Sequence, residues 1–278
     1  MTKKNLLLTQ RDYNFFVDLY HMTFLDIEYL KEVIYSSSSL PLIYERTKRL
    51  EEEGYIRSYR LPILTMGHQG TSKKAFTLDK KGISEVRQIL GWVDFDQRWT
   101  ERTPLTIHHS LEMAMVKASF QNKQEEFELV DWLNERRGFF KYGNDNGSEV
   151  IRPDGVVLLD HPKASKPFSF MLELERSKQM IEVTRNKLQR YNKYCKIQGY
   201  QKHIALEVNT PRILFISNKQ NEIEGLIRHS KGCDTSHIAG VLYTTYEQIR
   251  KDPYGQIFKA KDSKDENQRY HLAEKIIK

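Results

Sequence analysis

Cysteine is scarce in this chain: 278 residues include two, Cys195 and Cys233. The pair offers neither a disulfide framework nor the ligand spacing of a metal-binding motif, which fits a reducing cytoplasm. Long hydrophobic runs are also missing, and the start of the chain holds only three consecutive leucines before polar residues resume. The sequence therefore predicts a cytoplasmic protein with no signal peptide and no membrane contact.

Nucleotide-binding and nucleophile motifs are absent as well. There is no glycine-rich phosphate loop and no nucleophile elbow, and the sequences GHQG and YGND are typical of turns. Basic residues are in excess, with 44 Lys and Arg against 37 Asp and Glu, a formal net charge of +7. This balance favours a polyanionic partner, because cations that neutralise phosphates release counterions.

The first ninety residues predict a compact helical unit with a hairpin. A helix capped at Thr9 is followed by a second helix capped near Thr23. A third helix begins within SSSSLP, packs Leu42 inward and ends at Gly54. The runs GYIRSYRLPIL and KKAFTLDKKG then predict two strands joined by a turn, before a fourth helix that passes through Leu90.

This order of elements resembles a winged helix-turn-helix domain over residues 1–91. The resemblance implies a double-stranded DNA partner, with the third helix in the major groove and the basic hairpin along the phosphate backbone. The alternative is a protein-interaction module whose lysines serve solubility. The expected DNA-binding residues are Ser38, Tyr44, Arg46, Lys48, Arg49, Arg57, Arg60, Lys73 and Lys74.

A linker at residues 92–103 separates this unit from the rest of the chain. It contains Trp92, Phe95 and Trp99, which predict a docked segment because aromatic side chains seldom stay wholly exposed. Residues 104–278 then alternate strand-like runs, among them HIALEV, ILFISN and IAGVLYTT, with helical patterns. Such alternation predicts an α/β core.

Two strand-like runs in this second part, IRPDGVVLLD and FSFMLELERS, carry three carboxylates. Asp154 opens the first run, and Glu173 and Glu175 stand at i and i+2 on the second, where alternation places them on one face. Convergent carboxylates predict a site for Mg²⁺ or Mn²⁺. Ordinary salt bridges with neighbouring basic residues are the alternative.

The same runs resemble the PD-(D/E)xK nuclease-like fold. The sequence LELERS, followed by a helix with KLQRY at 187–191, is similar to the replication-relaxation proteins of bacterial plasmids and mobile elements. Glu175 stands where the nuclease motif places its lysine, and a carboxylate there adds repulsion towards a scissile phosphate. Lys187 on the following helix is the residue that could replace the missing lysine.

The sequence as a whole thus predicts a fold of the α+β or α/β class. Its N-terminal part resembles a winged helix-turn-helix, and the rest resembles a PD-(D/E)xK restriction-endonuclease-like α/β domain. The resemblance implies a role in replication initiation, relaxation or transfer of a plasmid or other mobile element, with a degenerate nuclease-like domain. Replication or relaxase proteins are the expected partners, and a homodimer the expected assembly. A metal-dependent endonuclease using Asp154, Glu173, Glu175 and Lys187, and a winged-helix transcription regulator, are the alternatives.

Overall fold

The protein consists of two compact units, Met1–Ala118 and Ser119–Lys278. The division falls inside a helix, α5 (Pro104–Gln121), so most of that helix belongs to the first unit and not to the second as the sequence prediction had it. Buried Ile107 and Leu111 explain this, because they pack with residues of the first unit. The structure, a computed structural model, describes residues 6–62, 72–121, 126–143, 149–175 and 180–274.

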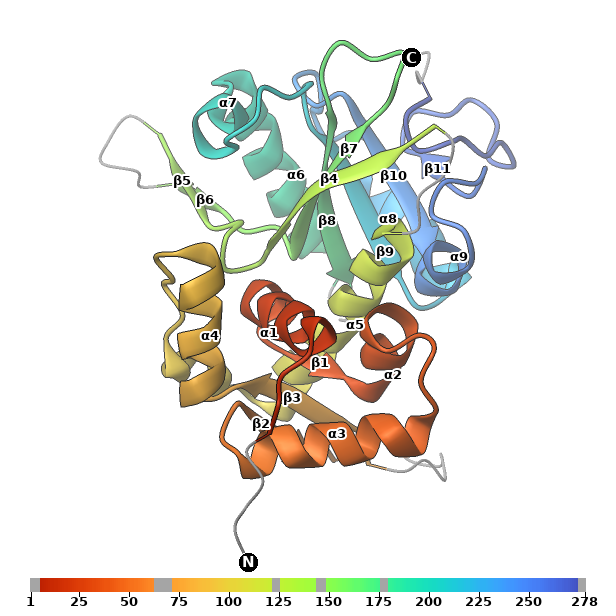
Figure 1. The fold of residues 1–278 in the computed structure, drawn as a ribbon. Helices are drawn as coiled ribbons and strands as arrows, with labels where there is room; N and C mark the ends of the chain where they lie inside the picture. Colours follow the sequence, from red (N-terminus) through yellow and green to blue (C-terminus); the bar gives the residue numbers. More distant parts are fainter. Residues whose placement is uncertain (1–5, 63–71, 122–125, 144–148, 176–179, 275–278) are drawn as a thin grey trace, which may run out of the picture. The chain divides into compact units, whose positions relative to one another are not determined.

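The first unit is a helical cluster on a small antiparallel sheet. Its three strands lie in the order β1-β3-β2, and α3 contacts β2 (Figure 1). Phe15, Phe16 and Leu19 of α1 are fully buried, and the Phe15 ring meets Phe76 of β3 edge to face at 6.2 Å. In chain order the elements are α1 (Gln10–Met22), β1 (Leu25–Asp26), α2 (Ile27–Tyr29), the π-helical turn η1 (Leu30–Ile34), α3 (Leu40–Glu52), β2 (Ile56–Arg60), β3 (Lys74–Leu78) and α4 (Lys80–Leu90).

Local sequence signals account for most of these boundaries. Thr9 and Asp12 form a capping box at the start of α1. Ser39 precedes α3, Pro41 occupies its first turn, and Gly54 follows it with a φ of 79°, a conformation that favours glycine. Glycine-rich residues 67–71, predicted to form the turn of the hairpin, lie outside the described residues.

Three sequence predictions for this unit differ from the structure. The predicted second helix is divided into strand β1, the short α2 and η1, because Leu25 and Asp26 pair with β3 instead. Leu42 is 58% exposed and does not pack inward. Trp92 is 85% exposed, whereas Phe95 is buried, with its ring 5.8 Å from that of half-buried Trp99.

The second unit is built on a mixed six-stranded sheet in the order β11-β10-β9-β8-β7-β4. Strands β8, β9 and β10 are parallel, and β4, β7 and β11 are antiparallel to their neighbours. Figure 1 shows α6 and α8 alongside these strands. The elements are β4 (Glu128–Asn134), the β5 (Phe140–Tyr142) and β6 (Glu149–Ile151) hairpin, β7 (Gly155–Asp160), β8 (Phe168–Glu175), α6 (Met180–Lys196), α7 (Gly199–His203), β9 (Arg212–Ser217), α8 (Gln220–Ser230), β10 (Gly240–Thr245), α9 (Tyr246–Lys251) and β11 (Lys259–Ala260). The 3-10 turn η2 (Gln97–Thr100) belongs to the first unit, where it follows α4 in the chain.

Helices α6 and α8 cover one face of this sheet. Each connects two parallel neighbouring strands, β8 to β9 and β9 to β10, and such crossovers share one hand and therefore one face. Their buried side chains, including Leu188 and Leu226, form one core with Phe215 and Tyr243 of the strands. The alternating patterns predicted an α/β core, and the structure of this unit confirms the coarser statement, helices and strands in a mixed α and β fold with a mixed sheet. HIALEV is not a strand: α7 ends at His203 and an irregular segment follows.

Candidate functional site

The three predicted carboxylates of the second unit meet where β7 begins and β8 ends. Gly155 pairs with Leu172, so the preceding Asp154 lies opposite Glu173. The backbone N–H of Asp154 donates to the Leu172 carbonyl at 2.9 Å, and its Oδ2 accepts from the N–H of Leu174 at 2.8 Å. Glu173 and Glu175 share a face of β8, because strand side chains alternate.

Lys187 of α6 lies between these two glutamates. Its Nζ donates to Glu173 Oε2 at 2.6 Å and to Glu175 Oε1 at 2.5 Å. One helical turn further on, the Tyr191 hydroxyl donates to the other oxygen of Glu173. The structure therefore brings Asp154, Glu173, Glu175 and Lys187 together, and adds Tyr191. The spacing of Lys187 and Tyr191 at i and i+4 was the available signal for that tyrosine.

The electrostatics of this acidic site are dominated by burial. Glu173 is 2% exposed and Glu175 is 5% exposed. Burial raises the pKa of Glu173 to about 7; the charge of Lys187 works against this rise and that of Asp154 adds to it. Burial alone would lower the pKa of Lys187, but the charges of Glu173 and Glu175 outweigh it and raise that pKa. The Lys187 ammonium thus serves two of the three carboxyl groups directly, those of Glu173 and Glu175.

Only some of the carboxylate oxygens of the acidic site are available to a divalent cation. Asp154 and Glu173 supply the carboxylate oxygens that Mg²⁺ and Mn²⁺ prefer. Glu175 and one oxygen of Glu173 are instead engaged by Lys187. Within the described parts of the chain, no group of three His, Cys, Asp or Glu residues is arranged to hold a metal ion. Because Tyr191 engages the other oxygen of Glu173, a cation held by Asp154 and Glu173 would share that carboxylate with Lys187 and Tyr191.

In the first unit, α3 presents an exposed face to solvent. Tyr44 is 49% exposed, Lys48 and Arg49 are exposed, and Arg60 is exposed at the end of β2. The Lys48 ammonium lies 3.9 Å from Glu52, an exposed i,i+4 pair of small energetic value. Arg49 and Arg60 form no ion pair with any residue that the structure describes. These four predicted DNA-binding residues are therefore accessible.

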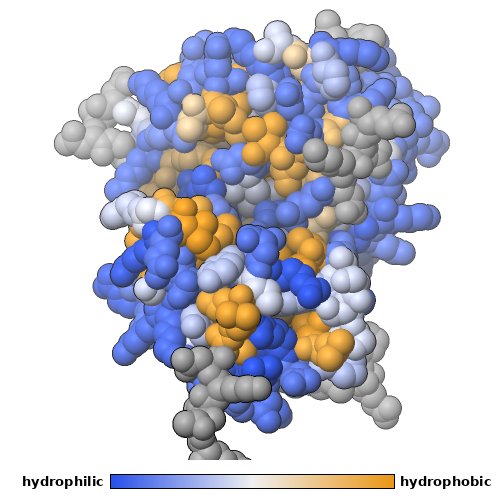
Figure 2. All heavy atoms as spheres, viewed as in Figure 1, coloured by the Kyte–Doolittle hydropathy of each residue, from blue (hydrophilic) through white to orange (hydrophobic). Residues whose placement is uncertain are grey.

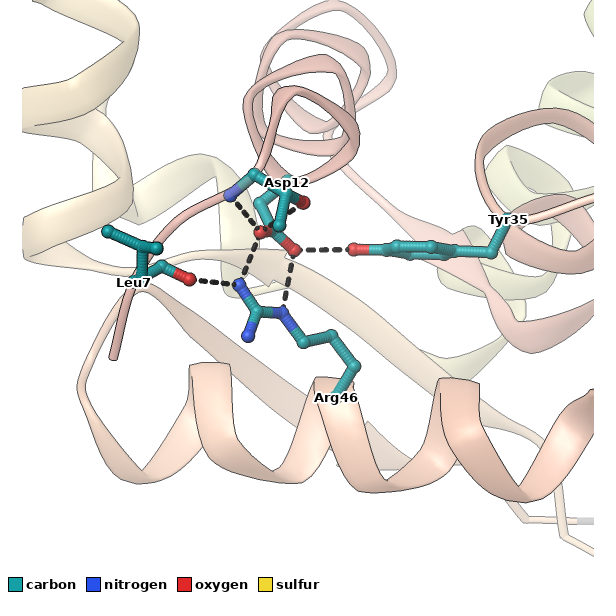
Figure 3. A network of polar contacts seen from close by, with 5 residues as sticks. Leu7, Asp12, Tyr35 and Arg46 are labelled. Atoms are coloured by element: carbon teal, nitrogen blue, oxygen red, sulfur yellow. Dashed lines mark hydrogen bonds and ion pairs between the residues drawn. The ribbon is translucent and has the colours of Figure 1, made fainter. Parts of the chain in front are cut away.

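Arg46, the remaining predicted DNA-binding residue on α3, points inward to Asp12 of α1 (Figure 3). Its Nε donates to Asp12 Oδ1 at 2.9 Å, and its Nη2 donates to Asp12 Oδ2 and, at 2.8 Å, to the Leu7 carbonyl. Tyr35, which follows η1, donates its hydroxyl to Asp12 Oδ1 at 2.8 Å, and Thr9 donates its N–H and hydroxyl to Oδ2. This network, the Asp12 clamp, ties α1, η1 and α3 together.

Burial by itself would raise the pKa of Asp12, but the hydrogen bonds from Arg46, Thr9 and Tyr35 outweigh it and lower that pKa. The carboxylate is fully buried and ionised, with donors on both oxygens. Arg46 therefore fixes the position of α3.

The remaining predicted DNA-binding residues have partners within the first unit. Lys73 lies 3.3 Å from Asp26 and 3.5 Å from Glu28, and Lys74 donates to Glu51 at 2.9 Å. Ser38 accepts from Arg11 at 3.2 Å, and Arg57 donates to Thr100 at 3.3 Å and lies 3.8 Å from Asp79. Any contact of these side chains with a ligand competes with those bonds.

Apolar side chains share the exposed face of α3. Leu40 is 46% exposed and Leu42 is 58% exposed, next to the accessible Tyr44. Figure 2 shows such apolar atoms as small patches separated by polar ones on the viewed face. A helix face of this mixed kind can meet both base edges and phosphates, because thymine methyl groups accept apolar contacts in the major groove.

Comparison with solved structures found similarity to the restriction endonuclease FokI, alone (14% identity, TM-score 0.34) and bound to DNA (15% identity, TM-score 0.30). Each match covers 90% of this chain and 46% of the FokI chain, so the protein spans about half the length of that enzyme. Such low TM-scores do not establish a common fold. A comparison with curated proteins found no match.

No helix in the described parts of the chain has the length and apolar content needed to cross a membrane. A protein-family model described as Replication-relaxation matches residues 16–208, which confirms the family resemblance carried by the LELERS and KLQRY sequences. The matched segment includes α3 of the first unit and the whole acidic site of the second. Because it covers more than half of the chain, the protein belongs to the Replication-relaxation family.

Proposed function

We propose that this protein binds double-stranded DNA through its first unit and acts in replication initiation, relaxation or transfer of a plasmid or other mobile element. The observation that carries the proposal is the element order α1-β1-α2-α3-β2-β3-α4 with the sheet order β1-β3-β2. That arrangement is the one expected of a winged helix-turn-helix, in which α3 is the recognition helix. Membership of the Replication-relaxation family supports the biological role.

Tyr44, Lys48, Arg49 and Arg60 are the proposed DNA contacts, because their side chains are accessible. Lys48, Arg49 and Arg60 supply charge for phosphates, whereas Tyr44 and the exposed Leu42 suit base edges. The Asp12 clamp holds α3 in a fixed orientation. The helix therefore loses less conformational entropy when it binds DNA. A homodimer and replication or relaxase partners belong to the same proposal.

The test uses the full chain and a short fluorescently labelled duplex. We expect the double variant Lys48→Glu/Arg49→Glu to lose about ten-fold or more in affinity, and the slope of log affinity against log salt to fall by about 2. Lys80→Glu/Arg87→Glu on α4 is the control, since it makes the same charge change on exposed residues of the same unit. Equal losses in both variants, or no duplex binding by the wild-type protein, would contradict the proposal.

A second candidate function, a metal-dependent DNA nuclease, is favoured by the position of Lys187. Its ammonium lies against Glu173 and Glu175, where a relocated motif lysine would be expected, and Asp154 lies opposite Glu173 on the neighbouring strand. Asp154 and Glu173 would hold Mg²⁺ or Mn²⁺, and the bound cation would supply Lewis-acid polarisation of a phosphodiester. Lys187 would then orient water or offset charge on the phosphate.

The two candidate functions are separated by nicking of supercoiled DNA in the presence of Mg²⁺ or Mn²⁺. If the protein is a nuclease, Asp154→Ala and Lys187→Ala abolish nicking, while Asp160→Ala, at the exposed far end of β7, leaves it unchanged. If the wild-type protein binds duplex but does not nick it, the second unit is a nuclease-like scaffold without catalysis.

A further inference from the structure

The second unit contains a basic cleft away from the acidic site. Its volume is about 500 Å³, and it lies between the C-terminal half of α8 and the segment that begins with β11. Five cationic and three acidic side chains line it, which gives the cleft a formal net charge of +2. The cations are Arg228, Lys231, Lys259, Lys261 and Lys264, and the acids are Glu224, Asp265 and Glu266.

Two of the five cations are engaged within the protein. Lys231 lies 3.6 Å from Glu266, and half-buried Lys261 contacts Asp262 at 3.2 Å and Thr235 at 3.1 Å. Among the described residues, the side chains of Arg228, Lys259 and Lys264 have neither a hydrogen bond nor an ion pair. Unpaired like charges that line one cavity repel each other, and an anion bound there would remove that repulsion.

The sheet register relates this cleft to the acidic site. Lys259 pairs with Tyr243, Tyr243 with Phe215, and Phe215 with Glu173. Paired residues in adjacent strands point to the same face, so Lys259 and Glu173 share the face that α6 and α8 cover. Three strand spacings separate them, about 14 Å between backbones.

We propose that the basic cleft binds the phosphate backbone of nucleic acid. Three cations of the cleft, Arg228, Lys259 and Lys264, have no partner among the described residues and suit the closely spaced negative charges of a phosphate backbone. The cations of the cleft come from two segments, residues 228–231 at the end of α8 and residues 259–264. This inference rests on the proposed function, because the ligand is again nucleic acid. It adds a second binding site, in the second unit, to the one proposed on α3 of the first.

The experiment measures duplex binding by the full chain over a range of salt concentrations. We expect Arg228→Glu/Lys264→Glu to weaken binding about ten-fold at low salt and to lower the salt slope by about 2. Lys219→Glu/Lys251→Glu is the matched control, because both lysines are exposed in the same unit and lie outside the cleft. The same loss in the control, or no loss in the cleft variant, would overturn the inference.

Further measurements separate the sources of phosphate and the two proposals. If calorimetry shows that inorganic pyrophosphate binds the wild-type protein and not the cleft variant, while duplex affinity is equal in both, the ligand is a small phosphate and the nucleic-acid inference fails. If only the α3 variant Lys48→Glu/Arg49→Glu weakens duplex binding, the cleft inference fails and the proposed function stands. No duplex binding by the wild-type protein would overturn both.

Discussion

Each unit of the protein has a buried carboxylate network, and the pKa of the central carboxyl group is shifted in opposite directions in the two. In the first unit, one carboxylate, Asp12, receives hydrogen bonds from Arg46, Tyr35 and Thr9. In the second, Glu173 and Glu175 share one ammonium, that of Lys187, with Asp154 close by. The pKa of Asp12 is accordingly lowered, and burial raises that of Glu173 to about 7.

This difference separates a structural clamp from a candidate reaction site. A buried charge surrounded by enough donors is neutralised and holds its neighbours in place, which is what Asp12 does for α3. A site with more acidic than basic groups keeps a demand for positive charge, which a proton or a metal cation can meet. Among the described residues, Asp154, Glu173 and Glu175 outnumber the basic Lys187, and this surplus, rather than the presence of an ion pair, is the indication of function.

The largest effect should follow removal of the ammonium from the acidic site. Lys187→Met leaves two buried glutamates without their cation, and we expect the free energy of unfolding to fall by about 4 kcal/mol. Lys193→Met on the same helix is the control, because its pair with Glu149 is exposed and should contribute about 0–1 kcal/mol. Urea unfolding of both variants measures the difference. Similar losses in the two variants would mean that the acidic site does not depend on Lys187.

Opening the Asp12 clamp should cost somewhat less. Asp12→Ala leaves Arg46, Tyr35 and Thr9 without their common acceptor, for an expected loss of about 3 kcal/mol, because Arg46 is partly exposed and can be hydrated. Glu45→Ala, on the exposed face of α3, is the matched control. If chemical denaturation finds Asp12→Ala as stable as Glu45→Ala, the clamp does not fix α3.

The smallest effect is a pH dependence with opposite signs in the two networks. Glu173 has a folded pKa of about 7 against an ordinary 4.5, so the folded state holds the proton more tightly, and its contribution to stability falls as pH rises from about 4.5 to about 7. We expect about 2 kcal/mol over that window. Asp12, with a lowered pKa, stabilises the fold above its ordinary 3.8 and loses that contribution as pH falls further.

The measurement for this prediction is the free energy of unfolding across the pH range, for the wild-type protein and for Glu173→Gln. The variant should lose the decline between about 4.5 and about 7, because its amide does not titrate. It should keep the loss of stability at lower pH that comes from Asp12. An unchanged decline in Glu173→Gln would assign the titration to another group.

Sequence patterns predicted individual helices and strands better than they predicted the tertiary contacts between them. Hydrophobic periodicity and caps at Thr9 and Ser39 indicated α1 and α3, because these signals act within one helical turn. Strand β1 was missed, since two residues carry no periodicity and are a strand only through their pairing with Phe76 and Ala75. The inward direction of the Arg46 side chain was missed for the same reason: its acceptor lies 34 residues earlier in the chain.

The sequence by itself determined that Glu173 and Glu175 share a face, because alternation along a strand follows from covalent geometry. It also determined the excess of basic residues and the family motifs around the acidic site. Only the tertiary structure decided that Lys187 contacts both glutamates, that Tyr191 joins them, and that Lys259 lies on their face of the sheet. Those placements depend on how α6 packs and how the strands are ordered, and the energy that fixes them comes from a core assembled over the whole unit.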